Sequence, residues 1–281
     1  MAFHFTKWHG LGNDFILVNG FQENLDATQY GKIAQKICDR HFGIGADGLI
    51  LLLPSERADL RMRIFNNDAS EAEMCGNGIR CLAVLAYEEG LVHQEKFTVQ
   101  TGAGILTPQL LFENGKPVGA CVDMGAPILE GEHIPVTGFG KERAVNTPIH
   151  VADKEFQMTC VSMGNPHVVI FVDDVENFPV TQYGPQLETS PRFPRKTNVE
   201  FVTVRNDGSL RMRVWERGAG VTLACGTGAC ATLVAAALTG RSKREANVHV
   251  DGGTLHIRWG EDNHIYMKGA AQRVFSGTFE L

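Results

Sequence analysis

The chain has 281 residues, of which 43% are hydrophobic and 21% are charged, as in ordinary globular proteins. Its net charge of −6, without a cluster of lysines and arginines, argues against a nucleic-acid partner. The longest apolar runs are too short to span a membrane, and the N-terminus lacks the pattern of a signal peptide. We therefore expect a cytoplasmic protein that has no membrane partner.

Short β-branched segments bounded by Gly, Asn or Asp predict antiparallel strands, the first at residues 14–19. An amphipathic helix is expected near residues 27–40, and a strand follows at Leu60–Asn66. Residues 79–87 are apolar almost all round, which predicts a helix buried on every side. Further strands are expected at residues 96–101 and 121–124.

The second half of the chain repeats the first. LRMRIFNNDASEAEMCGNG (60–78) aligns with LRMRVWERGAGVTLACGTG (210–228), so that Cys225 corresponds to Cys75, 150 positions earlier. GNDFILV from Gly12 corresponds to GNPHVVIF from Gly164, at an offset of 152. A second apolar helix is expected at residues 229–238. This duplication predicts two homologous halves, roughly 1–120 and 150–270, joined by residues 122–150.

The two cysteine motifs, CGNG and CGTG, lie where a loop leads into a predicted buried helix. A helix N-terminus carries unpaired N–H groups and about half a positive charge. This environment is expected to lower a thiol's pKa from about 8.5 to roughly 3.5–7.5. One such cysteine more often serves packing, but two equivalent ones, brought together by a pseudo-twofold axis, predict a catalytic pair.

Two opposed thiols beside a carboxylate site suit the inversion of a stereocentre. One thiolate removes the α-proton from one face, and the other thiol returns a proton to the opposite face. Backbone amides of Gly76, Asn77, Gly226 and Thr227 are candidates for binding the carboxylate, at about 3 kcal/mol each. No cofactor and no metal are predicted, because neither a pyridoxal-type pocket nor a CxxC pair is evident.

The sequence resembles the diaminopimelate epimerase family over essentially its whole length. The resemblance is carried by HGLGNDF (9–15), RHFGIGADG (40–48), FNNDASEAEMCGNGIRC (65–81), SMGNPH (162–167), TNVEF (197–201) and ERGAGVTLACGTGAC (216–230). It implies an α+β fold of two similar halves, each with antiparallel strands around a central helix. Residues 271–281 would join 1–120 in the half that carries Cys75, and 121–270 would form the half that carries Cys225.

The resemblance implies a cofactor-independent isomerase that converts LL-diaminopimelate into meso-diaminopimelate, in the synthesis of lysine and peptidoglycan precursors. Cys75 and Cys225 would be the acid/base pair, and His167 would tune or orient a reacting cysteine. The cradle of Gly76, Asn77, Gly226 and Thr227 would hold the reacting carboxylate. The distal end of the substrate would be recognised by Asn13, Asn66, Asn165, Asn198, Glu216 and Arg217. Gly48 departs from the pattern, since some members carry Gln there.

Other interpretations remain open from the residues alone. The asparagines also suit turns, His167 suits a packed histidine, and Glu216 with Arg217 suits a surface ion pair. The competing functions are a proline or hydroxyproline racemase, an isomerase of the phenazine-biosynthesis type, a thiol redox sensor and, least favoured, a metal-binding module. The expected partners are a small amino-acid substrate and, in a homodimer, a second copy of the chain.

Overall fold

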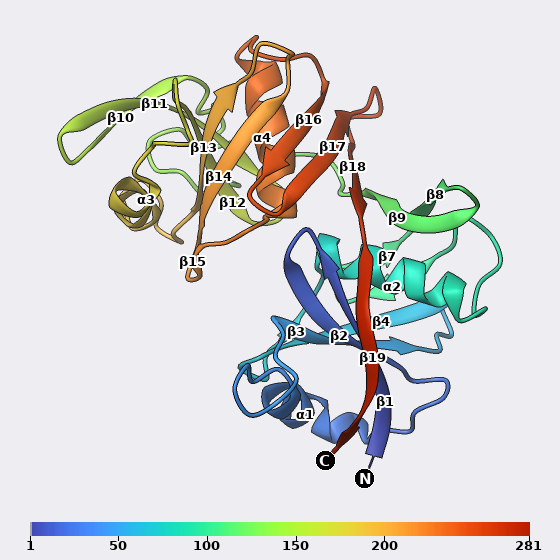
Figure 1. Cartoon of the computed structure of the whole chain (residues 1–281). Coiled ribbons are helices and arrows are strands. Elements are labelled where there is room, and N and C mark those ends of the chain that lie inside the picture. Colours follow the sequence, from blue (N-terminus) through green and yellow to red (C-terminus); the bar gives the residue numbers. More distant parts are fainter. Residues whose placement is uncertain (1) are drawn as a thin grey trace. The chain divides into compact units, whose positions relative to one another are not determined.

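A computed structural model describes residues 2–281 and divides into two compact units. The first unit extends to Asp123 and includes Lys268–Leu281, and the second is Met124–Met267. The helices of the two units together are a short 3-10 turn η1 (Ala27–Gln29), α1 (Tyr30–Ile37), α2 (Gly76–Glu88), α3 (Val180–Glu188) and α4 (Gly226–Leu238). Each unit thus contains one amphipathic helix, α1 or α3, and one long buried helix, α2 or α4 (Figure 1).

The sheet of the first unit has the strand order β19-β1-β2-β3-β4-β6-β7, with β5 paired to β4. Its strands are β1 (Ala2–Gly10), β2 (Asn13–Asn19), β3 (Gly48–Leu53), β4 (Leu60–Asn66), β5 (Glu71–Ala72), β6 (Val99–Thr101), β7 (Gly104–Leu106) and β19 (Gln272–Glu280). The last strand returns to pair with the first, so that both ends of the chain belong to this unit (Figure 1). A hairpin of β8 (Gln109–Glu113) and β9 (Lys116–Asp123) follows β7.

The second unit repeats this order as β10-β11-β12-β13-β14-β16-β17, with β15 paired to β14. Its strands are β10 (Thr147–Val151), β11 (Lys154–Ser162), β12 (Pro166–Phe171), β13 (Asn198–Val204), β14 (Leu210–Glu216), β15 (Gly220–Val221), β16 (Glu245–Val250) and β17 (Gly253–Trp259). β18 (Ile265–Ala270) spans the boundary between the two units. The repeated order agrees with the duplication predicted from the sequence.

The expectation of purely antiparallel strands is wrong for four strand pairs. β2 with β3, β4 with β6, β12 with β13 and β14 with β16 are parallel. The reason is the helices: a parallel pair needs a long crossover connection, and α1, α2, α3 and α4 lie in these four connections. The sheets are therefore mixed, within the same α+β class.

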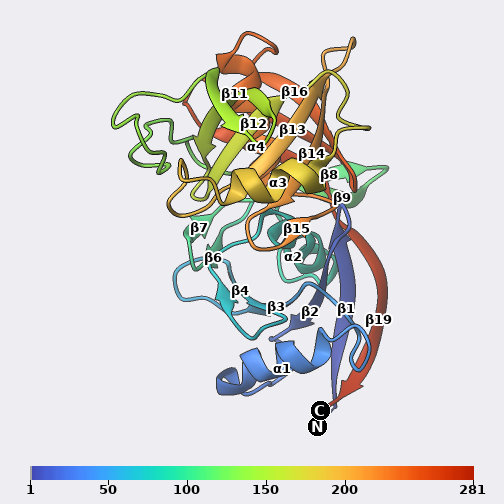
Figure 2. The same cartoon turned by 90° about the vertical axis from the view of Figure 1, so that its left-hand side faces the viewer.

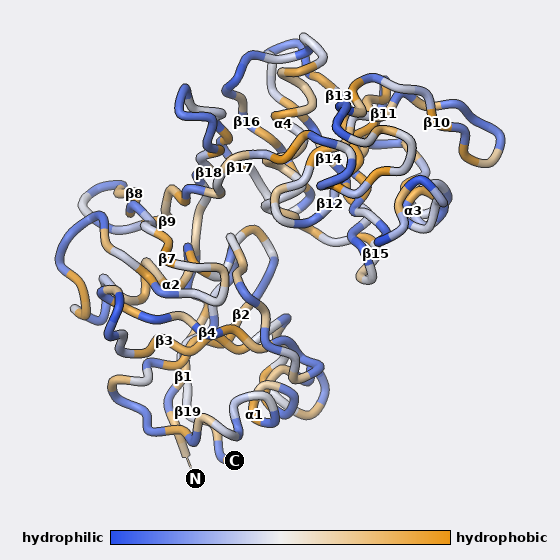
Figure 3. The backbone as a smooth tube through the Cα atoms, turned by 180° about the vertical axis from the view of Figure 1, so that it is seen from behind, coloured by the Kyte–Doolittle hydropathy of each residue, from blue (hydrophilic) through white to orange (hydrophobic). Residues whose placement is uncertain are grey.

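The two helices of a unit cover opposite faces of its sheet, as Figure 2 shows for α1 and α2 of the first unit. Side chains alternate along a strand, so Leu49 and Leu51 of β3 pack in the core beside α1. Ile50, between them, faces α2 and closely approaches Gly78. β3 is therefore buried on both faces, and Figure 3 shows its continuous apolar colouring.

Both long helices end at a glycine of left-handed conformation. Gly90 after α2 has φ of 68°, and Gly240 after α4 has φ of 70°. Glycine adopts this conformation without a Cβ clash, so it ends a helix readily. Within residues 2–281, no helix combines the length and the apolar character that crossing a bilayer requires.

Candidate active site

Cys75 and Cys225 occupy the same structural position in their units, the residue that caps the N-terminus of the buried helix. Both have an extended backbone, and the sulfur accepts a hydrogen bond from the backbone N–H of the second glycine in the motif. The distances are 3.5 Å from Gly78 and 3.4 Å from Gly228. Each sulfur therefore lies at the positive end of a helix, as the motif predicts.

The second glycine of each motif is required by packing against the neighbouring strand. A Cβ on Gly78 would lie 2.7 Å from Cδ1 of Ile50, and a Cβ on Gly228 would lie 2.7 Å from Oε1 of Glu200. A side chain at either position would thus force Ile50 or Glu200 to move. The spacing CGxG thus places the thiol at the N-cap and a glycine, which has no side chain, where the helix approaches the strand.

In the first unit, Asn13 joins Cys75 to Asn77. The Asn13 Oδ1 atom accepts hydrogen bonds from the Asn77 amide at 3.0 Å and from the Cys75 thiol at 3.7 Å. The Asn13 amide in turn donates to Asp47 at 2.7 Å, which fixes its orientation. Asp47 lies directly before β3. Three predicted site residues, Asn13, Cys75 and Asn77, therefore meet at the start of α2.

Arg80 supports this half-site from within the core, and the sequence analysis missed it. Its side chain is fully buried on α2 and donates to Asn77 Oδ1 at 2.9 Å and to the Gly76 carbonyl at 3.1 Å. Its Nε donates to the carbonyl of Ala270. The signal was present, since a lone arginine in an otherwise apolar helix must find buried partners. Arg80 fixes the first turn of α2 and the Asn77 side chain.

Replacing Arg80 by Met is therefore expected to damage both stability and substrate binding. The change removes a donor from the carbonyls of Gly76 and Ala270 and from the Asn77 side-chain oxygen, and an unsatisfied buried polar group costs about 1–3 kcal/mol. We expect the free energy of unfolding to fall by about 3 kcal/mol in urea titrations, and the KM for the amino-acid substrate to rise. An unchanged KM in folded protein would contradict the role assigned to Arg80.

Asn66 is not drawn into the network around Cys75. It is the last residue of β4, and its amide donates to the Ser70 hydroxyl at 2.9 Å, within its own turn. This contact is the turn role that the sequence left open. A contact between Asn66 and substrate stays a prediction.

In the second unit, hydrogen bonds connect Cys225 to a buried His167–Glu200 contact. The Cys225 sulfur lies 3.5 Å from the Thr227 hydroxyl, which accepts from the Asn165 amide at 3.3 Å. Asn165 Oδ1 lies 3.1 Å from Nε2 of His167. His167 Nδ1 lies 2.7 Å from Oε1 of Glu200, and both side chains are fully buried. The predicted residues Asn165, His167, Thr227 and Cys225 are thus brought together.

The expectation of an acidic thiol is wrong for Cys225. Burial raises the pKa of this thiol well above its ordinary range, and the carboxyl groups of Glu216 and Glu200 raise the pKa further. Hydrogen bonds from Thr227 and Gly228 offset only part of this effect. The helix terminus is outweighed because desolvation and two nearby acids all disfavour the thiolate. Cys225 therefore favours the thiol form.

Glu216, the last residue of β14, completes this half-site. Its carboxyl group accepts hydrogen bonds from the Thr222 hydroxyl and from the Cys225 thiol. Burial raises the pKa of Glu216, against the effect of these hydrogen bonds. Within residues 2–281, Glu216 and Arg217 do not form the ion pair that the sequence allowed. Glu216 contacts the candidate catalytic cysteine instead.

Asn198 and Arg217 lie together beside this site. The Asn198 amide donates to the carbonyl of Pro166 at 2.8 Å, and its Oδ1 accepts from the backbone N–H of Arg217 at 2.9 Å. The Arg217 side chain is exposed and donates to the carbonyl of Arg195 at 3.2 Å. Asn198 thus fixes the backbone position of Arg217. The guanidinium group of Arg217 remains accessible to solvent.

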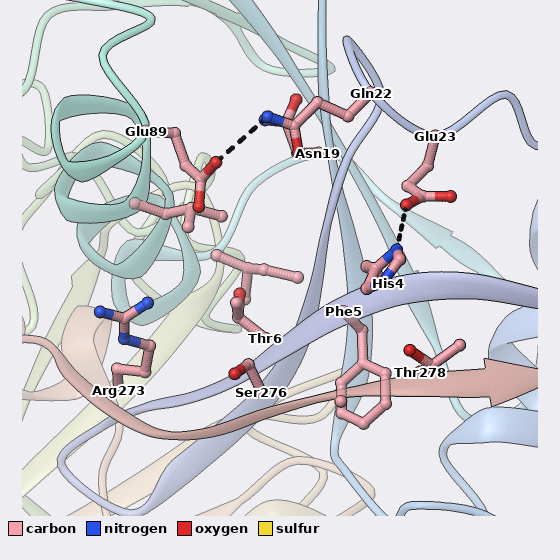
Figure 4. A pocket seen from close by; sticks show the side chains of 13 residues that line it. His4, Phe5, Thr6, Asn19, Gln22, Glu23, Glu89, Arg273, Ser276 and Thr278 are labelled. Atoms are coloured by element: carbon pink, nitrogen blue, oxygen red, sulfur yellow. Dashed lines mark hydrogen bonds and ion pairs between the residues drawn. The ribbon is translucent and has the colours of Figure 1, made fainter.

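A cavity of about 330 Å³ lies in the first unit, away from these residues. It is lined from β1, β2, β19 and the end of α2, and none of the predicted site residues borders it (Figure 4). His4 pairs with Glu23 at 2.9 Å on its rim, and Gln22 donates to Glu89. Asn19 also lines it, and its buried Nδ2 has no hydrogen-bond partner within residues 2–281.

Comparison with known proteins decides which family these half-sites represent. The family model described as "Diaminopimelate epimerase" matches residues 5–130 and 159–274. The chain is also 58% identical, over 279 residues and 99% of both chains, to a diaminopimelate epimerase of Moorella thermoacetica. It belongs to the diaminopimelate epimerase family. A diaminopimelate epimerase of Synechocystis is 53% identical over the full length of both chains.

Solved structures place the same fold in relatives with other names. A phenazine biosynthesis protein of the PhzF family from Bacillus anthracis has a TM-score of 0.72 at 19% identity, covering 100% of both chains. A hydroxyproline epimerase from Agrobacterium vitis has a TM-score of 0.67 at 15% identity, covering 99% of this chain and 91% of that one. These similarities support the two-unit fold, whereas the much higher sequence identities select the diaminopimelate epimerase family among proteins of this fold.

Proposed function

We propose that the chain converts LL-diaminopimelate into meso-diaminopimelate, with Cys75 and Cys225 as the two acid/base groups. The observation that carries this proposal is the equivalence of the two cysteines. Each caps the buried helix of a homologous unit and accepts from a backbone N–H of its first turn, and each contacts a further polar side chain, Asn13 or Thr227. Relatives named for this activity over nearly the whole chain support the choice of substrate.

The proposed reaction has one thiol on each face of the substrate's α-carbon. The thiolate takes the α-proton, so that an S–H bond forms as the C–H bond breaks. The electron pair moves into the carboxylate. The opposite thiol then gives its proton to the other face of the carbon and is left as a thiolate. Because Cys225 favours the thiol form, we assign it as the proton donor for the LL isomer and Cys75 as the base.

The α-carboxylate is proposed to bind the first turns of α2 and α4. The amides of Gly76, Asn77, Gly226 and Thr227 lie in these turns, where backbone N–H groups have no partner within the helix. Donors directed at the developing negative charge lower the barrier to proton removal by about 3 kcal/mol each. Proton transfer to and from the thiols contributes about 10²–10⁴-fold per group. The chain can thus stabilise the carbanion with its own groups.

Proton NMR of LL-diaminopimelate in D₂O tests this function. The purified, reduced protein without added cofactor should introduce deuterium at one α-position as the meso isomer forms. L-Proline and trans-4-hydroxy-L-proline serve as comparison substrates. Exchange only with these two compounds would move the assignment to a proline-type racemase. Absence of exchange with all three, in folded protein with titratable thiols, would refute the epimerase function.

We further propose that the chain works in the cytoplasm and forms a homodimer. Its acid/base thiols need a compartment that keeps cysteine reduced. β19 is the edge strand of the first sheet, and Val274 and Phe275 on it are about half exposed. An exposed apolar edge strand pairs readily with the same strand of a second copy.

Replacing Phe275 by Lys is expected to weaken this dimer strongly. A charge on the edge strand opposes pairing with an identical strand, because it places two like charges together. Sedimentation velocity at micromolar concentration should show a dimer for the unmodified chain and mainly monomer for the variant. Exposed Phe42, in the loop after α1, provides a matched control as Phe42→Lys. A monomeric unmodified chain would contradict the proposal.

A further inference from the structure

Glu200 is a buried carboxylate for which neither the fold nor the proposed reaction gives a reason. It lies in the middle of β13 and is fully buried. Its Oε1 contacts His167 Nδ1, but within residues 2–281 no group donates a hydrogen bond to Oε2. Burying an incompletely bonded carboxylate is costly, and apolar residues of similar volume are often more stabilising. Glu200 therefore requires an explanation beyond packing.

The first unit shows that the fold does not need a charge at this position. The strand pairs β12–β13 and β2–β3 have the same parallel register, which makes Ile50 the counterpart of Glu200 and Phe15 the counterpart of His167. Both Ile50 and Glu200 lie 2.7 Å from the Cβ position of a helix-start glycine. Apolar residues thus lie beneath the Cys75 helix, whereas a hydrogen-bonded histidine and carboxyl group lie beneath the Cys225 helix. This polar pair is specific to the half-site of Cys225.

Hydrogen bonds link Glu200 to Cys225 through His167, Asn165 and Thr227. Both nitrogens of His167 face oxygens, Glu200 Oε1 at 2.7 Å and Asn165 Oδ1 at 3.1 Å, an arrangement that a doubly protonated ring satisfies by donating on both sides. Because Asn165 accepts through its oxygen, its NH₂ group is left to donate to the Thr227 hydroxyl. The Thr227 oxygen accepts this hydrogen bond, and its own proton is available to the Cys225 sulfur, 3.5 Å away.

We propose that Glu200 is a positioning residue that keeps His167 doubly protonated and thereby keeps the Thr227 hydroxyl donating to the Cys225 sulfur. This donation stabilises the sulfur when it becomes a thiolate, after it has given its proton to the α-carbon. It also leaves the S–H bond free to point toward Glu216 or substrate. The inference rests on the proposed role of Cys225. Glu200 itself touches neither the sulfur's proton nor the substrate.

Two substitutions separate positioning from packing. Glu200→Gln keeps an oxygen acceptor but removes the charge, and Glu200→Ile introduces the residue of the first unit. We expect kcat to fall by about 10-fold in the Gln variant and about 100-fold in the Ile variant, with KM within about threefold of the original. Thermal stability should fall in the Ile variant, because His167 Nδ1 loses its acceptor in the core, and should fall less in the Gln variant, which keeps an oxygen there.

The matched control is Thr232→Val, which removes a buried hydroxyl from the same helix as Cys225. Within residues 2–281, the Thr232 hydroxyl bonds to the sulfur of Met212 and lies outside the hydrogen-bond chain. This variant should keep its kcat. If Glu200→Ile retains the same kcat as Thr232→Val, Glu200 serves packing alone and the proposal is wrong.

Nitrogen NMR of the 15N-histidine-labelled chain measures the protonation of the His167 ring nitrogens and does not depend on activity. The signals of His167 are identified as those that disappear in a His167→Gln sample. The proposal expects both ring nitrogens to be of the protonated type at neutral pH, and one to become unprotonated in Glu200→Ile. An unprotonated nitrogen in the original chain would overturn the proposal. An inactive original chain would instead refute the proposed function, while the NMR result still decides the state of His167.

Discussion

Replacing either Cys75 or Cys225 by Ser is expected to lower kcat for epimerisation by about 10³–10⁴-fold. A serine hydroxyl keeps the shape of the thiol but loses nearly all of its acidity, so it neither exists as the anion nor donates readily. General acid or base catalysis by one group contributes about 10²–10⁴-fold, and both faces need one. The two losses should be similar and far from additive in the double variant, because the groups act as a unit.

Cys121→Ser is the control for the chemistry of the substitution itself. Cys121 lies on β9, outside both half-sites, and is partly exposed. Its activity should remain within about twofold of the original chain, measured by formation of the meso isomer. Near-original turnover of either Cys75→Ser or Cys225→Ser would contradict the two-thiol mechanism. Circular dichroism on each variant separates loss of chemistry from loss of fold.

The duplicated fold could be predicted from the sequence because its signals are local. The repeated segments 60–78 and 210–228 fall on the same strand, loop and helix start in each unit. The buried helices were predicted from uninterrupted apolar residues, and the structure extends them by a few residues to Gly76–Glu88 and Gly226–Leu238. The parallel strand pairs were missed because alternation along a strand carries no information about the direction of its neighbour.

The candidate site was predictable where a residue sits in a repeated motif and was missed where its role depends on tertiary contacts. Asn13 contacts Cys75, Thr227 contacts Cys225, and Asn165 reaches Thr227, whereas their roles toward substrate stay predictions. Glu200 and Arg80, in contrast, are single ionisable residues in apolar segments, and only the fold reveals which polar groups they reach. The pKa of Cys225 was predicted with the wrong direction for the same reason, since it is raised by burial in the folded core and by Glu216 and Glu200, which approach from other strands.

Replacing Glu216 by Gln is expected to reduce activity while making the chain more stable. The Gln side chain can still accept from Thr222 and Cys225, but it carries no negative charge to receive or attract the thiol proton. We expect kcat to fall by about 10²-fold or more, as for the loss of a general acid–base group. Glu216 is thus expected to contribute to proton transfer at Cys225 more than to the position of the Cys225 side chain.

The gain in stability follows from the direction of the pKa shift. Burial raises the pKa of Glu216 in the folded chain above its unfolded value of about 4.3. The folded state therefore holds the proton more tightly, and stability is lost as pH rises through the folded-state pKa. The Gln variant avoids this loss. Its melting temperature should exceed that of the original chain by roughly 3 °C at neutral pH, and the difference should vanish near pH 4.

Calorimetric melting curves between pH 4 and 8 test this expectation, with Glu71→Gln as the control. Glu71 is largely exposed and paired with Arg63 at 2.7 Å, which lowers the pKa of its carboxyl group. Glu71→Gln should leave the stability unchanged or slightly reduced at neutral pH, in contrast to the gain expected for Glu216→Gln. A Glu216→Gln chain that is less stable than the original at pH 7 would show that the carboxylate is well accommodated there. The carboxylate of Glu216 would then support catalysis without lowering the stability of the chain. We expect it to lower stability because the same burial that makes Glu216 costly to ionise keeps it in contact with the Cys225 thiol.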